Sequence, residues 1–325
     1  MSEKSRHRTK PDSRAPTRGT PTASGQELPF SLEPDHRASP GGASQGPALG
    51  RSDTGPIRLP EALPLLQALG IATSKGEIRA EKRRKFTQIN RFVELVGFLF
   101  QGAPKRRMQF LDCGCGKSYL SFVLNYYLRE KLRRHCHFWG IDANPERIRQ
   151  ATALRDALGY DNMEFVASRV AAFRPPEPPD GVLSLHACDT ATDEAIAKGI
   201  ELGARFILAV PCCQSELLNQ LGSQQPLASI TRHGVYGARF ADVLTDGLRT
   251  LALEAAGYDV SVVEYVSPED TPKNLMIRAE RQSGRNTTAL HRYWDQVTQF
   301  GVDPAIQRFL PWLRPRREKS QRSPR

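Results

Sequence analysis

The stretch FLDCGCGKSYL, residues 110–120, is the most informative segment of this chain. It opens with apolar residues typical of a buried strand, turns through Asp-x-Gly-x-Gly, and continues in a pattern typical of a helix. Gly114 and Gly116 allow the backbone to turn tightly and to approach a ligand, because neither residue has a Cβ. Asp112, at the end of the strand, can hold this turn or accept a hydrogen bond from a ligand. The stretch therefore predicts a strand, a ligand-binding turn and a helix.

The residues that follow alternate between strand and helix patterns. Short apolar runs predict five strands, at 108–111, 138–141, 163–166, 182–185 and 206–210. Helical patterns lie between them, at 117–134, 145–158 and 190–203. Thr190-x-x-Asp193 looks like a capping box at the start of the last helix. This alternation predicts a parallel sheet with helices on both faces.

The last two predicted strands break this rhythm. Residues 259–266 and 274–279 have strand patterns, but the link 267–273 contains two prolines and is too short for a crossover helix. Parallel neighbours need about a dozen connecting residues or more, so this pair should be an antiparallel hairpin. The expected fold class is α/β: a Rossmann-like, doubly wound sheet of seven strands, mostly parallel with an antiparallel last strand. Such a sheet distinguishes class I methyltransferases from dinucleotide-binding domains.

Two aspartates at neighbouring strand ends indicate the cofactor. A dinucleotide-binding loop usually has a third glycine near position 119 to seat a pyrophosphate, but this residue is Tyr119. S-adenosylmethionine has no pyrophosphate, and a carboxylate at Asp142 can accept from both ribose hydroxyls of an adenosyl group. The alternative is a structural glycine turn followed by a helix-capping aspartate. The predicted residues for S-adenosylmethionine are Asp112, Gly114, Gly116, Asp142 and, near the adenine, Ser168.

The predicted catalytic residues are His186 and Asp189, just after the fourth strand. Ligands of a doubly wound sheet bind beyond the carboxyl ends of its strands. Methyl transfer from a sulfonium is an in-line displacement, in which the protein aligns the acceptor and, for a hydroxyl acceptor, removes a proton. The alternatives are a histidine that packs the strand end and an aspartate that caps the next helix.

The cysteines near this edge, Cys188, Cys212 and Cys213, admit sharper interpretations. A nucleophilic thiolate for methylating a pyrimidine carbon would sit in Pro-Cys after the fourth strand, whereas Pro-Cys here follows the fifth. The chain has no CxxC pair, so we expect no metal site and take these residues as small pocket-lining side chains. The cysteine spacings are not those of a disulfide framework, which indicates a reducing, cytoplasmic setting. No apolar run is long enough to predict a membrane span.

Three further segments resemble one group of class I methyltransferases. They are LHACDTATDEAI (185–196), AVPCCQ (209–214) and DTPKNLMIRA (270–279). Over about residues 80–280 the chain resembles the methyltransferase domain of glutathione S-transferase C-terminal-domain-containing proteins. The His-x-Cys-x-x-x-Thr-Asp element also resembles that of tRNA 2′-O-methyltransferases that modify the acceptor stem, although Asp189 stands where those enzymes carry glycine. The resemblance implies the cofactor and the reaction type, and implies that residues 232–249 cover the acceptor.

The composition around this core predicts five regions. Residues 1–55 are rich in Pro, Gly, Ser, Thr and Arg with almost no large apolar residues, which predicts disorder. The N-terminal helices should start late or bend at Pro60 and Pro64. The expected order is a disordered tail (1–55), a helical extension (56–104), the S-adenosylmethionine-binding methyltransferase domain (105–281), C-terminal helices (282–313) and a basic flexible tail (314–325).

The net charge of +11 is unevenly distributed. Residues 75–107 carry ten basic and three acidic side chains, and residues 314–325 carry six basic and one acidic. Segregated positive charge favours polyanions, so we predict an RNA substrate, tRNA or rRNA, bound through residues 75–107 and the C-terminal tail. A solvated face with a solubilising tail is the plainer alternative. Two other functions stay open: methylation of a small molecule or protein side chain, and a non-catalytic binding protein with this fold.

Overall fold

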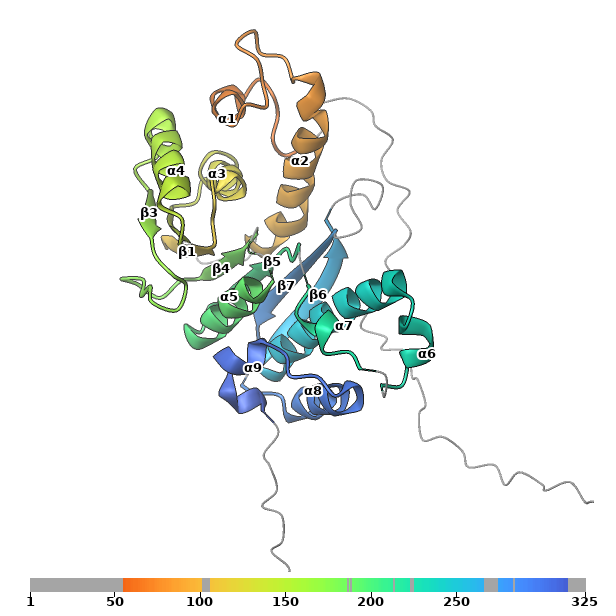
Figure 1. Cartoon of the computed structure of the whole chain (residues 1–325). Helices are drawn as coiled ribbons and strands as arrows, with labels where there is room; N and C mark the ends of the chain where they lie inside the picture. Colours follow the sequence, from red (N-terminus) through yellow and green to blue (C-terminus); the bar gives the residue numbers. More distant parts are fainter. Residues whose placement is uncertain are drawn as a thin grey trace, which may run out of the picture. The chain divides into compact units, whose positions relative to one another are not determined.

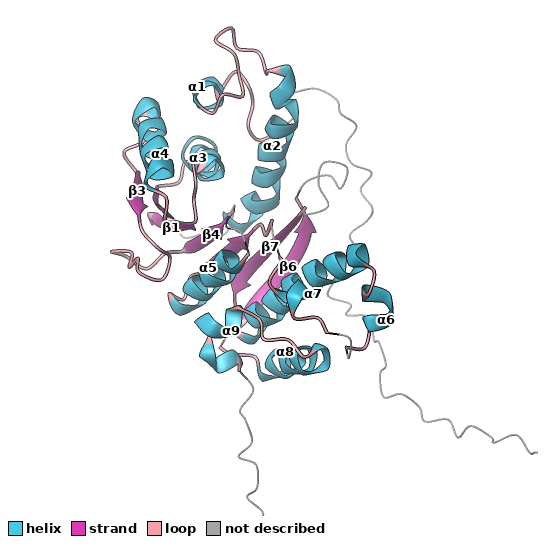
Figure 2. Ribbon diagram, in the orientation of Figure 1, coloured by secondary structure: helices cyan, strands magenta, loops and turns pink. Residues whose placement is uncertain are grey.

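The computed structural model of the chain contains one sheet of seven strands, in the order β3-β2-β1-β4-β5-β7-β6 (Figures 1 and 2). Its strands are β1 (Met108–Cys113), β2 (Cys136–Asp142), β3 (Met163–Ala167), β4 (Gly181–Ser184), β5 (Phe206–Ala209), β6 (Tyr258–Glu264) and β7 (Leu275–Arg281). The first five pair in parallel, and β7 runs antiparallel to both β5 and β6. The expected mixed sheet with a reversed last strand is confirmed.

The structure describes most of the chain between the two predicted tails. The described residues are 55–100, 106–185, 187, 189–212, 214–222, 225–265, 274–282 and 284–314. The disordered tail predicted over residues 1–55 and the flexible tail predicted over residues 314–325 therefore lie almost wholly outside the described residues, as does the link between β6 and β7.

Helices cover both faces of the sheet, above and below it in Figure 1. On one face lie α1 (Leu63–Ala68), α2 (Arg83–Gly97), α3 (Tyr119–Tyr126) and α4 (Pro145–Leu158). On the other lie α5 (Thr190–Glu201), α6 (Ala228–Thr231), α7 (Gly234–Ala255), α8 (Thr287–Phe300) and α9 (Ile306–Phe309). Because both faces are covered, β1 and β2 are buried along their whole length. Across the described residues, every helix is either too short or too polar to span a lipid bilayer.

The N-terminal region forms two separate helices with an irregular connection. The prolines at 60 and 64 delay α1 until Leu63. The chain then turns through Gly70 and Gly76, both with positive φ, before α2 begins at Arg83. The buried side chain of Asn90 holds the start of this region, because its Oδ1 accepts from the Ile57 N–H at 2.8 Å. The expected late start of the first helix is confirmed.

The helix after the glycine turn is shorter than its sequence pattern predicts. Ser118 has a left-handed backbone, with φ of 57°, so α3 begins only at Tyr119. Its α-helical part ends at Tyr126 and continues as a π-helical turn to Lys131. The predicted helix at 145–158 is confirmed as α4, which ends at the left-handed Gly159.

Candidate cofactor and acceptor site

The carboxylate of Asp112 lies buried at the end of β1, beneath the first turn of α3. Its Oδ2 accepts hydrogen bonds from the hydroxyls of Ser118 at 2.8 Å and Ser121 at 2.7 Å. Its Oδ1 is buried and has no hydrogen-bond partner among the described residues. Burial raises the pKa of Asp112 to about 6, although the two hydroxyls act to lower it. Asp112 therefore holds the turn with one oxygen and leaves the other for a ligand, since unsatisfied buried acceptors are costly.

The glycine turn adopts a conformation that few other residues tolerate. Gly114 and Gly116 have φ values of 66° and 56°, in the left-handed region. A Cβ at Gly114 would lie 3.2 Å from the Cβ of Ala187, in the segment after β4. The N–H of Cys115 donates to the carbonyl of Ile141 at 2.9 Å, which fastens the turn to β2. The turn is thus packed between the ends of three strands.

Asp142, at the end of β2, binds the same turn from the other side. Its Oδ2 accepts from the Gly116 N–H at 2.9 Å, and its Oδ1 accepts from the Asn144 N–H at 2.8 Å. A guanidinium nitrogen of Arg147 lies 3.6 Å from Oδ2. Each carboxylate oxygen has two lone pairs, so these bonds leave capacity for further donors such as ribose hydroxyls.

Ser168 lies beside Asp142, as its position after the third strand predicts. Its N–H donates to the carbonyl of Asp142 at 3.0 Å, which extends the parallel pairing of β2 and β3. Its hydroxyl donates to the carbonyl of Arg169 at 3.1 Å. Contact of this residue with adenine stays a prediction.

Asp189 links the segments that follow β4 and β5. Its carboxylate accepts from the Ser215 hydroxyl at 3.0 Å and from the Glu216 N–H at 3.4 Å. The structure shows no hydrogen bond from its side chain to the start of α5, so the helix-capping alternative is wrong. Its backbone, with φ of 51° and ψ of −126°, is also unusual for a residue other than glycine. His186, Cys188 and Cys213 lie outside the described residues.

The predicted capping box at Thr190-x-x-Asp193 is also wrong. The Asp193 carboxylate accepts two hydrogen bonds from the guanidinium of Arg249 on α7, from Nε at 3.0 Å and from Nη2 at 2.6 Å. A buried, charge-assisted pair of bonds is stronger than a bond to a backbone N–H at the helix start. The Thr192 hydroxyl instead donates to the Ala187 carbonyl at 2.8 Å, which fixes the approach to α5.

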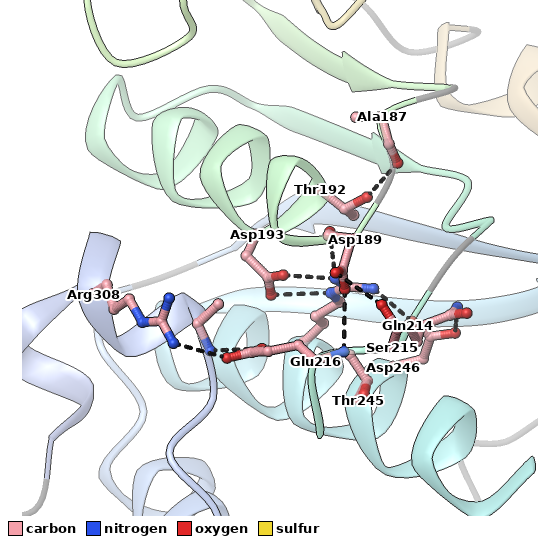
Figure 3. Close-up of polar contacts among 12 residues, drawn as sticks. Ala187, Asp189, Thr192, Asp193, Gln214, Ser215, Glu216, Thr245, Asp246 and Arg308 are labelled. Atoms are coloured by element: carbon pink, nitrogen blue, oxygen red, sulfur yellow. Dashed lines mark hydrogen bonds and ion pairs between the residues drawn. The ribbon is translucent and has the colours of Figure 1, made fainter. Parts of the chain in front are cut away.

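Arg249 is the centre of a buried polar network, in which Asp193 and Asp246, labelled in Figure 3, both accept hydrogen bonds from its guanidinium. Only 1% of its side chain is exposed. Besides Asp193, it donates from Nη1 to Asp246 at 3.0 Å and from Nη2 to the backbone carbonyl of Asp189 at 2.9 Å. The other oxygen of Asp246 accepts from Nε2 of Gln214 at 2.8 Å. The expected pairing of Asp246 with Arg249 is confirmed, within a larger network.

Burial shifts the pKa of several charged groups in this network. Burial raises the pKa of Asp246, with Arg249 acting in the opposite direction. Burial also raises the pKa of Glu216, and the nearby charges of Asp193 and Asp189 add to that effect. For Arg249, burial acts to lower the pKa, but the carboxylates of Asp193 and Asp246 raise it overall, so the guanidinium stays charged. Several carboxylates thus lie close together beside the segments that follow β4 and β5.

The opposite flank of the cofactor turn is basic. The ammonium of Lys85, near the start of α2, lies 4.0 Å from the centre of the Tyr119 ring at the start of α3. Burial lowers the pKa of Lys85, and the charges of Lys82 and Lys117 lower it further. Lys117 belongs to the glycine turn itself, so three lysines gather where α2 meets the cofactor turn.

Comparison with known proteins finds a family model that matches the central part of the chain. Residues 84–220 match a family model described as a methyltransferase domain, and the strand order of the sheet, with β7 reversed, is that of class I. Residues 84–220 thus match a methyltransferase domain, and the sheet has the class I methyltransferase strand order. The match begins within α2 and includes the glycine turn, Asp142 and the segments after β4 and β5.

One curated relative has a similar sequence. The chain is 27% identical, over 237 residues, to a glutathione S-transferase C-terminal domain-containing protein of Mus musculus. The aligned part is 64% of this chain and 35% of the mouse protein, so the chain spans about a third of the relative's length.

Solved structures with the same fold are more distant. Magnesium protoporphyrin IX methyltransferase from Synechocystis PCC 6803, with bound S-adenosylmethionine, is 15% identical with a TM-score of 0.40, over 68% of this chain and 91% of that one. Methyltransferase PaMTH1 of Podospora anserina, bound to S-adenosylhomocysteine, is 12% identical with a TM-score of 0.42, over 71% and 91% of the two chains. The fold assignment depends on the strand order and not on these scores.

The cofactor of the methyltransferase domain is S-adenosylmethionine, and the residues of the turn fit this molecule. The unpartnered Oδ1 of Asp112 would accept from its ammonium group. Asp142, one strand away, would accept from its ribose hydroxyls. The side-chain-free Gly114 and Gly116 leave the backbone accessible between the two carboxylates.

Three of the described cysteines are unsuited to act as nucleophiles, because their thiols are buried and stay protonated. Cys113, Cys115 and Cys136 are buried free thiols, and burial raises the pKa of each. Cys212, which is partly exposed, is also a free thiol. Among the described residues, no group of three His, Cys, Asp or Glu side chains is arranged to hold a metal ion.

Several site residues were not predicted from the sequence. The hydroxyls of Ser118 and Ser121 bind the carboxylate of Asp112. The sequence feature that could have indicated this is two serines at the start of an otherwise apolar helix. The link from Arg249 to Asp193 crosses more than fifty residues of sequence, and only the short spacing of Asp246 and Arg249 hinted at it.

Proposed function

We propose that this domain transfers a methyl group from S-adenosylmethionine to RNA. The observation that carries the proposal is the group of three lysines, Lys82, Lys85 and Lys117, beside the cofactor turn. Ammonium groups bind phosphates by charge and by hydrogen bonds, and such contacts position a nucleic acid without reading its sequence. Further exposed arginines on the same segment, Arg79 and Arg83, extend this positive surface away from the turn.

The charge difference across the site supports the same substrate class. Lysines lie on the α2 side of the cofactor turn, whereas Asp189 follows β4, Glu216 follows β5 and Asp246 lies on α7. Phosphates would be repelled from the acidic side. We infer that the RNA backbone lies along α2 and that the target nucleoside faces the acidic side.

In the proposed reaction, bound S-adenosylmethionine supplies an electrophilic methyl group. Asp112 and Asp142 would hold the amino acid and ribose parts, while the glycine turn keeps the backbone close to them. If the acceptor is a hydroxyl, His186 or Asp189 would take its proton as the new bond forms. An acceptor nitrogen with a free lone pair would need alignment alone.

Labelled methyl transfer into a whole-cell extract tests the proposal. Purified protein and S-adenosylmethionine with a radiolabelled methyl group are added to the extract, which is then separated into RNA, protein and small-molecule fractions. The expected result is label in RNA, abolished in an Asp142→Ala control. Label only in protein or in small molecules would overturn the RNA proposal. Those outcomes would favour a cationic acceptor, for which the carboxylates beside the site provide a suitable environment.

A further inference from the structure

We propose that Arg249 is a positioning residue, which holds the two acceptor-side segments, residues 187–189 and 214–216, in the geometry needed for methyl transfer. The inference builds on the proposed function, because it assigns these segments to the acceptor. It concerns a residue on α7 that lies outside the cofactor turn and is buried from solvent.

Arg249 contacts the first segment directly and the second segment through the side chain of Asp246. It donates to the carbonyl of Asp189 at 2.9 Å, which fixes the first segment. It also orients Asp246, whose second oxygen accepts from Gln214 at 2.8 Å and so fixes the second segment. Asp189 and Ser215 then join the two segments to each other at 3.0 Å. Figure 3 shows these contacts meeting between α5 and α7.

The backbone of Asp189 indicates that this geometry is imposed by its surroundings. With φ of 51° and ψ of −126°, it occupies a region that suits glycine and costs conformational energy for other residues. Among the described residues, only Ser118 and Arg133 are other non-glycine residues with positive φ. Such a conformation persists only where neighbouring contacts over-determine it.

Stability alone does not account for the network. A buried ion pair is often no more stabilising than well-packed apolar residues of similar volume, because both charges lose their hydration. A planar guanidinium, however, presents donors in fixed directions, and all three nitrogens of Arg249 are used here. A lysine would keep the charge but lose these directions. The arrangement therefore defines positions more than it adds stability.

Arg249→Lys is the central test variant, and Arg106→Lys is its matched control. Arg106 also makes a two-point contact with an aspartate, Asp180, but at the opposite edge of the sheet, before β1 and β4. Amide hydrogen exchange of residues 187–189 and 214–216 is compared in the three full-length proteins, at a temperature where circular dichroism shows each to be folded. The affinity for S-adenosylmethionine is measured by calorimetry. The kcat and KM for methyl transfer are measured with the RNA fraction that the wild type labels as substrate.

We expect the backbone amides of both segments to exchange about tenfold faster in Arg249→Lys. We also expect kcat to fall about tenfold or more, because misplacing a reacting group by about 1 Å lowers the rate by up to about a hundredfold. S-adenosylmethionine affinity and the KM for RNA should change less than about threefold. Arg106→Lys should match the wild type. Unchanged exchange and kcat in Arg249→Lys would overturn the proposal, as would an equal loss in the control.

A second variant guards against misfolding of Arg249→Lys. Asp246→Asn keeps the size of the side chain but removes the charge that orients Nη1 and Gln214. The variant should raise the rate of amide exchange in residues 214–216 more than in residues 187–189. If both segments exchange at the wild-type rate in Asp246→Asn, the proposed network is contradicted. If the wild type labels no RNA, the proposed function fails, while the exchange comparison still decides whether Arg249 positions the segments.

Discussion

At the scale of single residues, Asp112 combines a buried carboxylate with a missing hydrogen-bond partner. Its pKa is raised from 3.8 to about 6 in the folded chain. For an acid, a raised pKa means that the folded state is penalised where the group is ionised. The penalty is absent below about pH 4 and fully present above about pH 6, where it amounts to roughly 3 kcal/mol. A bound cation would remove much of it.

We therefore predict that S-adenosylmethionine affinity falls as the pH drops through 6. Protonation of Asp112 removes the charge that its ammonium group would bind, so Kd should rise about tenfold per pH unit below the pKa. Calorimetric titrations at about pH 7.5 and about pH 5 measure the change. The Asp112→Asn variant should bind S-adenosylmethionine weakly at both pH values. Its stability should also lose the pH dependence that the Asp112 carboxyl causes. Equal wild-type affinity at the two pH values would contradict the prediction.

Asp189 supports a second prediction at this scale. Asp189→Gly relieves the positive φ, which is worth about 1 kcal/mol, but removes the carboxylate that binds Ser215. We expect an unchanged or higher melting temperature together with at least about a tenfold loss of kcat. Asp189→Asn, which keeps the size and the strain, is the matched control for the charge. Full activity of Asp189→Gly would show that the carboxylate is dispensable.

The clustering of residues around the glycine turn could be predicted from the sequence, whereas the surroundings of Asp189 could be predicted only in part. Asp112, Gly114, Gly116 and Asp142 occur in short local patterns at strand ends, and the structure brings them together. Asp189 was identified, but its environment was not, because its partners come from distant segments. A buried guanidinium leaves no periodic signal, so the bond from Arg249 to Asp193 could not be expected from sequence.

At the scale of elements, α2 brings a basic surface to the cofactor turn. Phe86, Ile89 and Val93 are buried against the core, whereas the lysine and arginine side chains at its start are exposed or half-buried. The strand and helix sequence was predicted correctly because burial on both faces leaves continuous apolar runs. Element boundaries were less predictable: the left-handed Ser118 shortened α3, and Arg249 replaced the expected cap of α5.

The lysines beside α2 give a prediction about salt. Each phosphate contact contributes about −0.7 to −0.9 to the slope of log K against log salt. Lys82→Ala with Lys117→Ala should therefore weaken RNA binding and reduce the magnitude of this slope by about 1.4 to 1.8. Fluorescence anisotropy with a labelled tRNA between about 50 and 200 mM salt measures it. A pair of substitutions on another helix of the same layer, Arg149→Ala and Arg155→Ala on α4, serves as control, and an equal effect there would contradict a specific surface.

At the scale of the whole molecule, the cofactor turn and the acceptor side belong to different layers. Asp112 faces α3 on one side of the sheet, while Arg249 and its partners lie with α5 and α7 on the other. The C-terminal helices join the second layer, because Glu216 accepts from the Ala305 N–H at 3.0 Å and from Arg308 at 3.2 Å. Cofactor binding should stabilise the first layer and, through the shared sheet, the entire fold.

We predict a rise in melting temperature with S-adenosylmethionine. A ligand at about a hundred times its Kd stabilises the folded state by roughly 2.7 kcal/mol. Differential scanning fluorimetry of the wild type should show this shift, and Asp142→Ala should lose it, from a lower starting melting temperature because Gly116 and Asn144 lose their acceptor. Arg106→Lys should keep it. A shift of equal size in Asp142→Ala would mean that the ligand binds elsewhere.

The reversed strand also constrains how the chain is made. Strand β7 fills the slot between β5 and β6, yet it is the last of the seven to leave the ribosome. Until residues 275–281 emerge, the nascent chain carries two strands whose hydrogen-bonding edges face an empty position. Open edges of this kind invite pairing with other chains. Nascent or truncated chains that stop before Leu275 are thus the forms most in need of a chaperone.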